Sequence, residues 1–123
     1  MNLKLSYKLQ NSNFKLKISG SKSETNRLLV LQALYRNLVL ENSSTSDDSE
    51  VMIEALATQY LIPKTQYPKI DVHHAGTAMR FLTAYFAAQD GFEVQLTGSS
   101  RMKERPIKIL VDALNQLGAE ITY

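Results

Sequence analysis

Along this chain, segments whose apolar residues recur at the two-residue period of a β-strand alternate with segments whose apolar residues have helical spacing. The pattern predicts strands over residues 37–41, 69–72, 92–96 and 119–123, and helices over residues 22–35, 48–60, 77–88 and 106–117. Strands that alternate with helices of about 10–15 residues indicate an α/β fold. A chain of 123 residues has room for one such domain, residues 1–123, and little room for a second.

The opening segment, residues 1–18, is expected to form a β-hairpin. Apolar residues alternate on both sides of a polar loop at residues 10–13: Leu3, Leu5, Tyr7 and Leu9 before it, and Phe14, Leu16 and Ile18 after it. The chain also ends within a predicted strand, which suggests a piece of something longer.

Composition excludes several classes of protein. The 14 Lys and Arg residues against 12 Asp and Glu residues give a net charge of +2, whereas a nucleic-acid binder is usually more basic. No apolar run approaches the roughly 20 residues that span a bilayer, and the start of the chain does not read as a signal peptide. Without cysteine there is no disulfide, thiolate metal site or thiol nucleophile. We expect a cytoplasmic protein without a nucleic-acid or membrane partner.

Three loops that lead into predicted helices combine small residues with cations. The first runs from Ser19 to Arg27, and Ser21 and Glu24 have the spacing of a capping box. Lys22 and Ser23 would lie at the helix start, where free N–H groups and the helix dipole favour anions, and Arg27 would follow about one turn later. The spacing is not that of a Walker A loop. An anion site and a simple capped helix remain equally good interpretations.

The second loop, residues 73–80, contains Gly76, which permits close backbone approach to a ligand, and Thr77, a candidate cap and phosphate donor. The adjacent His73 and His74 point in different directions and have no obvious third ligand, so we expect no metal.

The third loop, residues 97–106, carries three cations within five residues: Arg101, Lys103 and Arg105. They could bind a carboxylate or phosphate, and an ordinary surface patch is the equally simple alternative.

Taken together, these segments resemble the EPSP synthase family, the enolpyruvyl transferases that act on shikimate 3-phosphate. The matching stretches are Ser19-Gly20-Ser21-Lys22-Ser23 with Asn26-Arg27, Ala75-Gly76-Thr77-Ala78-Met79-Arg80, and Leu96-Thr97-Gly98 with Arg101-Met102-Lys103-Glu104-Arg105-Pro106-Ile107. Their order and approximate spacing also fit, and Val111 to Ala119 extends the last match.

The resemblance implies an architecture. Family members are built from repeated βαβαββ units in an inside-out α/β barrel arrangement with two domains and the active site between them. This chain is then a partial, N-terminal portion that lacks the C-terminal domain. The hairpin 1–18 is expected to pair with that missing domain, or with a second copy in a homodimer through an exposed sheet edge.

The resemblance also implies a reaction and its residues. The 5-hydroxyl of shikimate 3-phosphate adds to C2 of phosphoenolpyruvate, and the tetrahedral intermediate then loses phosphate; neither a metal nor an organic cofactor is needed. Lys22 resembles the catalytic lysine between both substrates. Ser23 and Arg27 resemble residues that hold shikimate 3-phosphate, whereas Gly76, Thr77 and Arg101 resemble residues of the phosphoenolpyruvate pocket, where the inhibitor glyphosate also binds. With half the site missing, the isolated chain is expected to be inactive.

Two departures from the family pattern leave glyphosate sensitivity and pocket detail open: His74 replaces a frequent asparagine, and Phe81 stands where proline is familiar. One alternative is the related transferase that acts on a UDP-amino sugar, UDP-N-acetylglucosamine enolpyruvyl transferase. That family has a reactive cysteine, which this chain lacks. It also has no counterpart of the Ser-x-x-x-Arg pattern that Ser23 and Arg27 form here. A non-catalytic module that binds anions or phosphate is the alternative from another class.

Overall fold

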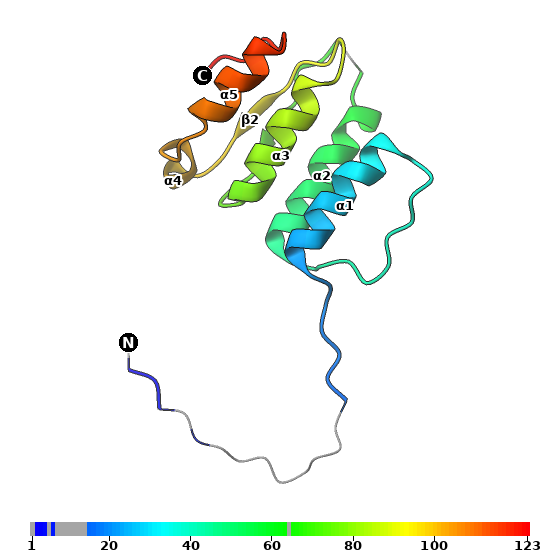
Figure 1. Ribbon diagram of the computed structural model, residues 1–123, viewed down its shortest axis with the longest axis vertical. Coiled ribbons are helices and arrows are strands. Elements are labelled where there is room, and N and C mark those ends of the chain that lie inside the picture. The colour runs from blue at the N-terminus through cyan, green and yellow to red at the C-terminus, as the bar shows by residue number, and fades with distance from the viewer. Residues whose placement is uncertain (1, 5, 7–14, 64) are drawn as a thin grey trace.

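The computed structural model describes residues 2–4, 6, 15–63 and 65–123. Over these residues the elements in chain order are α1 (Lys22–Leu34), α2 (Asp47–Leu61), β1 (Lys69–Asp71), α3 (Gly76–Ala87), β2 (Gln95–Thr97), α4 (Ser100–Lys103) and α5 (Lys108–Gln116) (Figure 1). The order confirms an α/β chain. No helix in the described ranges has the length and apolar character that crossing a membrane requires.

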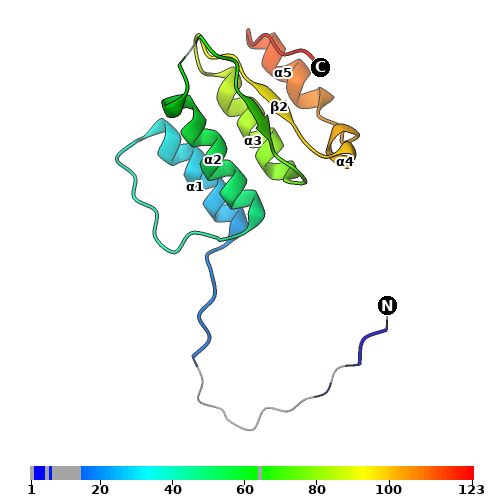
Figure 2. The same cartoon turned by 180° about the vertical axis from the view of Figure 1, so that it is seen from behind.

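A parallel β–α–β unit forms the centre of the structure. Strands β1 and β2 pair in parallel with Ile70 opposite Leu96, and α3 makes the connection between them. Seen from behind, both strands run along one side of α3 (Figure 2). Because parallel strands need a crossover, the carboxyl end of β1 leads directly into the start of α3.

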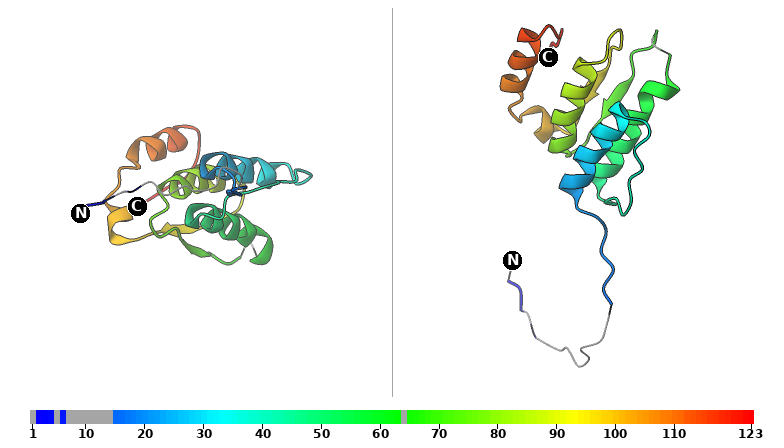
Figure 3. Two further views of the ribbon diagram at one scale, coloured as in Figure 1. Left: turned by 90° about the horizontal axis from the view of Figure 1, so that it is seen from below. Right: turned by 45° about the vertical axis from the view of Figure 1, so that its right-hand side comes forward.

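Helix α3 is also the centre of the helical packing. Helices α1 and α2 pack against each other and against α3, and α5 contacts α3 from the other side (Figure 3). The apolar core has its most deeply buried side chains on three different elements or their ends: Met52 on α2, Val72 after β1, and Ala78 and Leu82 on α3. The phenol of Tyr85 accepts a hydrogen bond of 2.6 Å from Gln59 Nε2, which joins α2 to α3 near their C-terminal ends.

Polar contacts fasten α1 to its neighbours. The helix buries two polar residues, Thr25 and Asn26, and one large apolar residue, Leu29. Thr25 Oγ1 accepts a 2.9 Å hydrogen bond from the N–H of Ser44, and Asn26 Oδ1 accepts one of 2.9 Å from Ser49 Oγ on α2. These bonds set the position of α1 relative to α2.

Local sequence signals predicted the helices well. Ser21 caps α1 by accepting from the N–H of Glu24 at 3.4 Å, as the capping-box spacing indicated. Helix α2 ends before Pro63, and Gly118 follows α5 with φ of +102°, a conformation that glycine adopts without strain.

Two strand predictions are wrong: residues 37–41 and 119–123 contain no strand. A strand needs a partner strand for its backbone groups, and among the described residues the only paired strands are β1 and β2. Gln32 Nε2 donates to the carbonyl of Leu38, while the Asn115 amide bonds both the N–H and the carbonyl of Ile121. The strand predicted over residues 92–96 is shorter and lies later, as β2, and the third loop contains the short helix α4.

Most of the predicted hairpin 1–18 lies outside the described residues. Within residues 2–4, 6 and 15–18 there is no strand, and Leu16 and Ile18 are exposed. The apolar alternation alone does not form a strand in this part of the chain, since no partner strand lies beside it among the described residues.

Gly20 provides the first testable prediction. A Cβ at this position would lie 1.9 Å from the carbonyl oxygen of Asn42, which is backbone and cannot move aside easily. We expect Gly20→Ala to lower the free energy of unfolding by about 1–3 kcal/mol, the usual cost of overpacking. Urea unfolding followed by circular dichroism measures this change. The exposed Ser19→Ala serves as control, and equal midpoints for the two variants would contradict the predicted clash.

The second prediction concerns Tyr85. Burial raises the pKa of its phenol above the ordinary 10.0, although the hydrogen bond from Gln59 opposes that shift. Because the folded-state pKa is the higher one, the associated stability is present below pH 10 and is lost as the pH rises through the folded-state pKa. We expect the unfolding free energy to fall more steeply above about pH 10 in the unmodified chain than in Tyr85→Phe. Parallel slopes in denaturant titrations at several pH values would contradict this.

Candidate functional site

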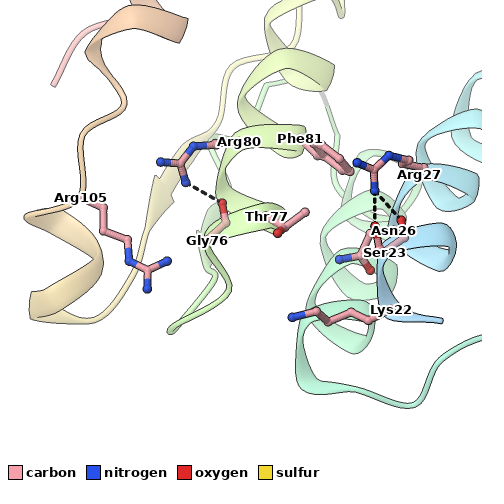
Figure 4. A pocket seen from close by; sticks show the side chains of 9 residues that line it. All are labelled: Lys22, Ser23, Asn26, Arg27, Gly76, Thr77, Arg80, Phe81 and Arg105. Carbon is pink, nitrogen blue, oxygen red and sulfur yellow. Dashed lines mark hydrogen bonds between the residues drawn. The ribbon is translucent and has the colours of Figure 1, made fainter.

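A cavity of about 360 Å³ opens between the N-terminal ends of α1 and α3. Its lining residues are Lys22, Ser23, Asn26, Arg27, Gly76, Thr77, Arg80, Phe81 and Arg105. Figure 4 shows the α1 residues on one side, the start of α3 in the middle and Arg105 on the opposite side. Three segments far apart in the sequence therefore form one site.

Helix α1 contributes four residues to the cavity, and its 3.6-residue period places them on one face. Residues 22 and 26, and likewise 23 and 27, are one turn apart, so they lie on the same face. The Arg27 guanidinium donates to the carbonyl of Ser23 at 2.8 Å and also to the Ser23 hydroxyl. It lies 5.6 Å from the ring centre of Phe81 on α3, a cation–π distance. These contacts hold the charged group of Arg27 at the cavity.

Helix α3 contributes an uncapped N-terminus. Ala75 precedes the helix and provides no side-chain cap, whereas serine side chains cap α1, α2 and α4. The first N–H groups of a helix have no partner within it, and together with the helix dipole they favour an anion. Gly76 and Thr77 stand at this end of α3 and line the cavity.

Two arginines flank Gly76. Arg80 donates to the carbonyls of Gly76 and Pro106, both at 3.1 Å, so it links α3 to the segment before α5. A Cβ on Gly76 would lie 2.3 Å from one terminal nitrogen of Arg105 and 3.6 Å from a nitrogen of Arg80. The absence of a side chain at position 76 is what lets the Arg105 guanidinium reach the start of α3.

The charge of the site is one-sided. Lys22, Arg27, Arg80 and Arg105 line the cavity, and no acidic residue of the described ranges lines it. One acid lies close to these cations: the carboxylate of Asp48 is 3.7 Å from the ammonium of Lys22. Four cations that share one accessible cavity repel each other unless an anion lies between them. The arrangement is suited to an oxyanion ligand such as a phosphate or a carboxylate.

A second cavity, of about 180 Å³, lies beside the first. It is lined by His74, Ser99, Arg101, Met102 and Arg105. Arg105 borders both cavities, so they are neighbours. The two adjacent histidines have different surroundings. His73 Nδ1 lies 3.6 Å from Asp71 Oδ1, whereas His74 lines the second cavity. The described residues hold no group of three or more potential metal ligands.

The structure brings five of the six predicted site residues to one cavity: Lys22, Ser23, Arg27, Gly76 and Thr77. Arg101 lines the second cavity instead. The ligand roles of all six remain predictions. The residues that sequence reasoning did not include in the site are Asn26, Arg80 and Phe81, and Arg105 was only one of three candidate cations in its loop. Helical spacing from Lys22 and from Gly76 was the available signal for Asn26 and Arg80.

Gly76→Ala provides the prediction for this site. The added methyl group must displace the Arg105 guanidinium, so the affinity for inorganic phosphate should fall about ten-fold or more, as expected for one charge-assisted hydrogen bond. Isothermal titration calorimetry measures the affinity. The matched test is a double-mutant cycle with Arg105→Ala, in which Gly76→Ala should have little further effect. A full loss in that background would show that the methyl group acts on the ligand directly.

Comparison with known proteins identifies the family of this chain. Residues 35–123 match the family model of EPSP synthase (3-phosphoshikimate 1-carboxyvinyltransferase). A 3-phosphoshikimate 1-carboxyvinyltransferase from Bacteroides fragilis (strain YCH46) is 46% identical over 109 residues, covering 88% of this chain and 25% of the relative. One from Hamiltonella defensa is 41% identical over 126 residues, covering 86% of this chain and 29% of the relative.

A larger relative shows the same similarity. The pentafunctional AROM polypeptide of Schizosaccharomyces pombe is 41% identical over 127 residues, which cover 85% of this chain and 8% of that protein. No solved structure matches the chain significantly. The chain spans about a quarter of the length of the first curated relatives that it matches. It belongs to the EPSP synthase family.

Proposed function

We propose that this chain supplies part of the site at which the enolpyruvyl group of phosphoenolpyruvate is transferred to the 5-hydroxyl of shikimate 3-phosphate. The observation that carries the proposal is the cavity with four cations and no lining carboxylate, at the starts of α1 and α3, in a chain of the EPSP synthase family. The relatives named above as 3-phosphoshikimate 1-carboxyvinyltransferases support the choice of reaction.

The charge of the two substrates explains why such a cavity is required. A phosphate group carries about −1.5 to −2 at neutral pH, and each substrate also has a carboxylate. Two such anions repel each other in solution, so cations and N–H donors that are already in position lower the cost of bringing them together. Lys22, Arg27, Arg80 and Arg105 supply the positive charge, and the start of α3, which no side chain caps, adds the positive end of the helix dipole.

Each predicted residue has a proposed role. Lys22 stands at the meeting point of both substrates, and Ser23 and Arg27 hold shikimate 3-phosphate. The hydrogen bond from Arg27 to Ser23 supports a shared role for these two. Gly76, Thr77 and Arg101 belong to the phosphoenolpyruvate side. Arg105 borders both cavities, which supports including Arg101 in the same extended site.

The proposed reaction is an addition followed by an elimination. The 5-hydroxyl oxygen bonds to C2 of phosphoenolpyruvate while the methylene carbon gains a proton, and the tetrahedral intermediate then loses phosphate. Neither a metal nor an organic cofactor has a part in this proposal. No carboxylate lines the described cavity, so the acid and base groups are proposed to come from the part of the enzyme that this chain does not include. The isolated chain is therefore proposed to bind and not to turn over.

We also propose that the β–α–β unit belongs to a repeated βαβαββ architecture with a second domain, in a cytoplasmic enzyme. Exposed apolar side chains on α1 (Leu28, Leu31 and Leu34) support a covering surface in the complete protein. A homodimer through a sheet edge is the proposal for the isolated chain, and sedimentation over a range of concentrations tests it.

A titration of the ¹⁵N-labelled chain with shikimate 3-phosphate tests the proposed function. We expect saturable amide shifts centred on Lys22, Ser23 and Arg27, with weaker responses to unphosphorylated shikimate and to inorganic phosphate. Equal responses to all three anions would reduce the site to a general anion-binding module. No response from a folded chain would overturn the proposal that it binds this substrate.

Substitution of Arg27 gives a sharper comparison. Arg27→Ala removes one charged donor from the cavity and should weaken shikimate 3-phosphate binding about ten-fold or more. The matched control is Arg36→Ala, because the Arg36 guanidinium lies outside the cavity, 4.8 Å from the ring centre of Tyr60. Equal losses of affinity for the two variants would show that only net charge matters.

A further inference from the structure

Asn26 is the one buried polar side chain of the cavity whose hydrogen bonding is incomplete in the described part of the chain. The residue is 0% exposed and lines the cavity. Its oxygen is bonded, whereas its nitrogen Nδ2 is buried and has no acceptor among the described residues. Among these residues it is the only buried side-chain nitrogen or oxygen of this kind, so it differs from the rest of a well-satisfied interior.

A hydrogen bond from Ser49 on α2 orients the Asn26 amide. Ser49 Oγ donates to Asn26 Oδ1 at 2.9 Å, and Ser49 is itself 0% exposed. The Ser49 hydroxyl lies 3.1 Å from that of Ser46, the residue that caps α2. Since Oδ1 and Nδ2 are attached to the same planar carbon, fixing the oxygen also fixes the nitrogen. In Figure 4 the amide lies beside Ser23 and Lys22, across the cavity from Thr77.

A buried N–H donor without an acceptor is unfavourable, and folded proteins rarely retain one without a reason. The residues around Asn26 indicate which acceptor would bond Nδ2. The cavity wall around Asn26 contains Lys22, Arg27 and two further arginines, which attract an oxyanion. An oxygen of a phosphate or carboxylate is both the acceptor that Nδ2 lacks and the ligand that these charges favour.

We propose that Asn26 Nδ2 donates a hydrogen bond to an oxygen of the anion bound in this cavity, and that Ser49 is a positioning residue that aims the amide. The identity of the anion as shikimate 3-phosphate or phosphoenolpyruvate rests on the proposed function. The contact from Asn26 requires only an oxyanion, so inorganic phosphate is a valid probe as well.

The side-chain amide resonances of Asn26 test this without any substitution. In the ¹⁵N-labelled chain we expect the Nδ2 protons to shift and to gain protection from exchange when inorganic phosphate, phosphoenolpyruvate or shikimate 3-phosphate is added. The response to each probe shows which anion places an oxygen there. The amide of Asn37, an exposed residue outside the cavity, should remain unchanged.

Variants provide the second measurement. Asn26→Ala should weaken binding of the responding probe about five- to ten-fold, and Ser49→Ala, which leaves the amide present and no longer aimed, about two- to three-fold. When Ser49→Ala is added to the Asn26→Ala variant, we expect no further loss of affinity, because the amide that Ser49 positions is already absent. Asn37→Ala is the matched control. Thermal unfolding of each variant shows whether it remains folded.

The outcomes separate the two proposals. If the unmodified chain binds a probe and Arg27→Ala weakens that binding, while the Asn26 resonances stay unchanged and Asn26→Ala binds normally, the Asn26 contact is overturned and the proposed function stands. If no anion binds the folded chain, both proposals are overturned for this chain. If Asn26→Ala fails to fold, the resonances of the unmodified chain decide.

Discussion

The site depends on how α1 is attached to the rest of the fold, and buried polar contacts are part of that attachment beside the apolar packing of Leu29. Thr25 and Asn26 are buried on this helix, and each accepts a hydrogen bond from outside it, one from the backbone of Ser44 and one from Ser49 on α2. Hydrogen bonds depend on both distance and angle, and a buried donor or acceptor that loses its partner is costly. The polar contacts therefore fix the height of α1, and with it the positions of Lys22 and Arg27 relative to α3.

Charge and geometry are divided between different residues of the cavity. The side chains with full charges, Lys22, Arg27, Arg80 and Arg105, are solvent-exposed, so they keep most of their hydration and still attract anions over some distance. The neutral donors, Asn26 and the start of α3, are buried and oriented by the fold. A ligand that satisfies both groups also relieves the repulsion among the cations, and its binding adds to the stability of the folded chain.

The helices were predictable from the sequence, and several of the strands were not. Ser21 before Lys22, Pro63 after α2 and Gly118 after α5 are local signals, and the structure confirms each of them. Strands require partners that the sequence pattern does not identify. Residues 69–71 and 95–97 pair through the α3 crossover. Residues 37–41 and 119–123 have no partner strand among the described residues, and the side chains of Gln32 and Asn115 bond single backbone residues there, Leu38 and Ile121.

The parts of the site that lie within one helical turn follow directly from the order of residues in the chain. Lys22, Ser23 and Arg27 share a face because the helical period requires it, and Gly76 and Thr77 stand at a helix start because β1 and its short loop end there. Tertiary packing brings Arg80 and Arg105 to them and places Arg101 at a neighbouring cavity. It also leaves Asn26 Nδ2 without an acceptor among the described residues. Spacing along one helix follows from its repeat, but the distance between helices follows from long-range packing that no short motif contains.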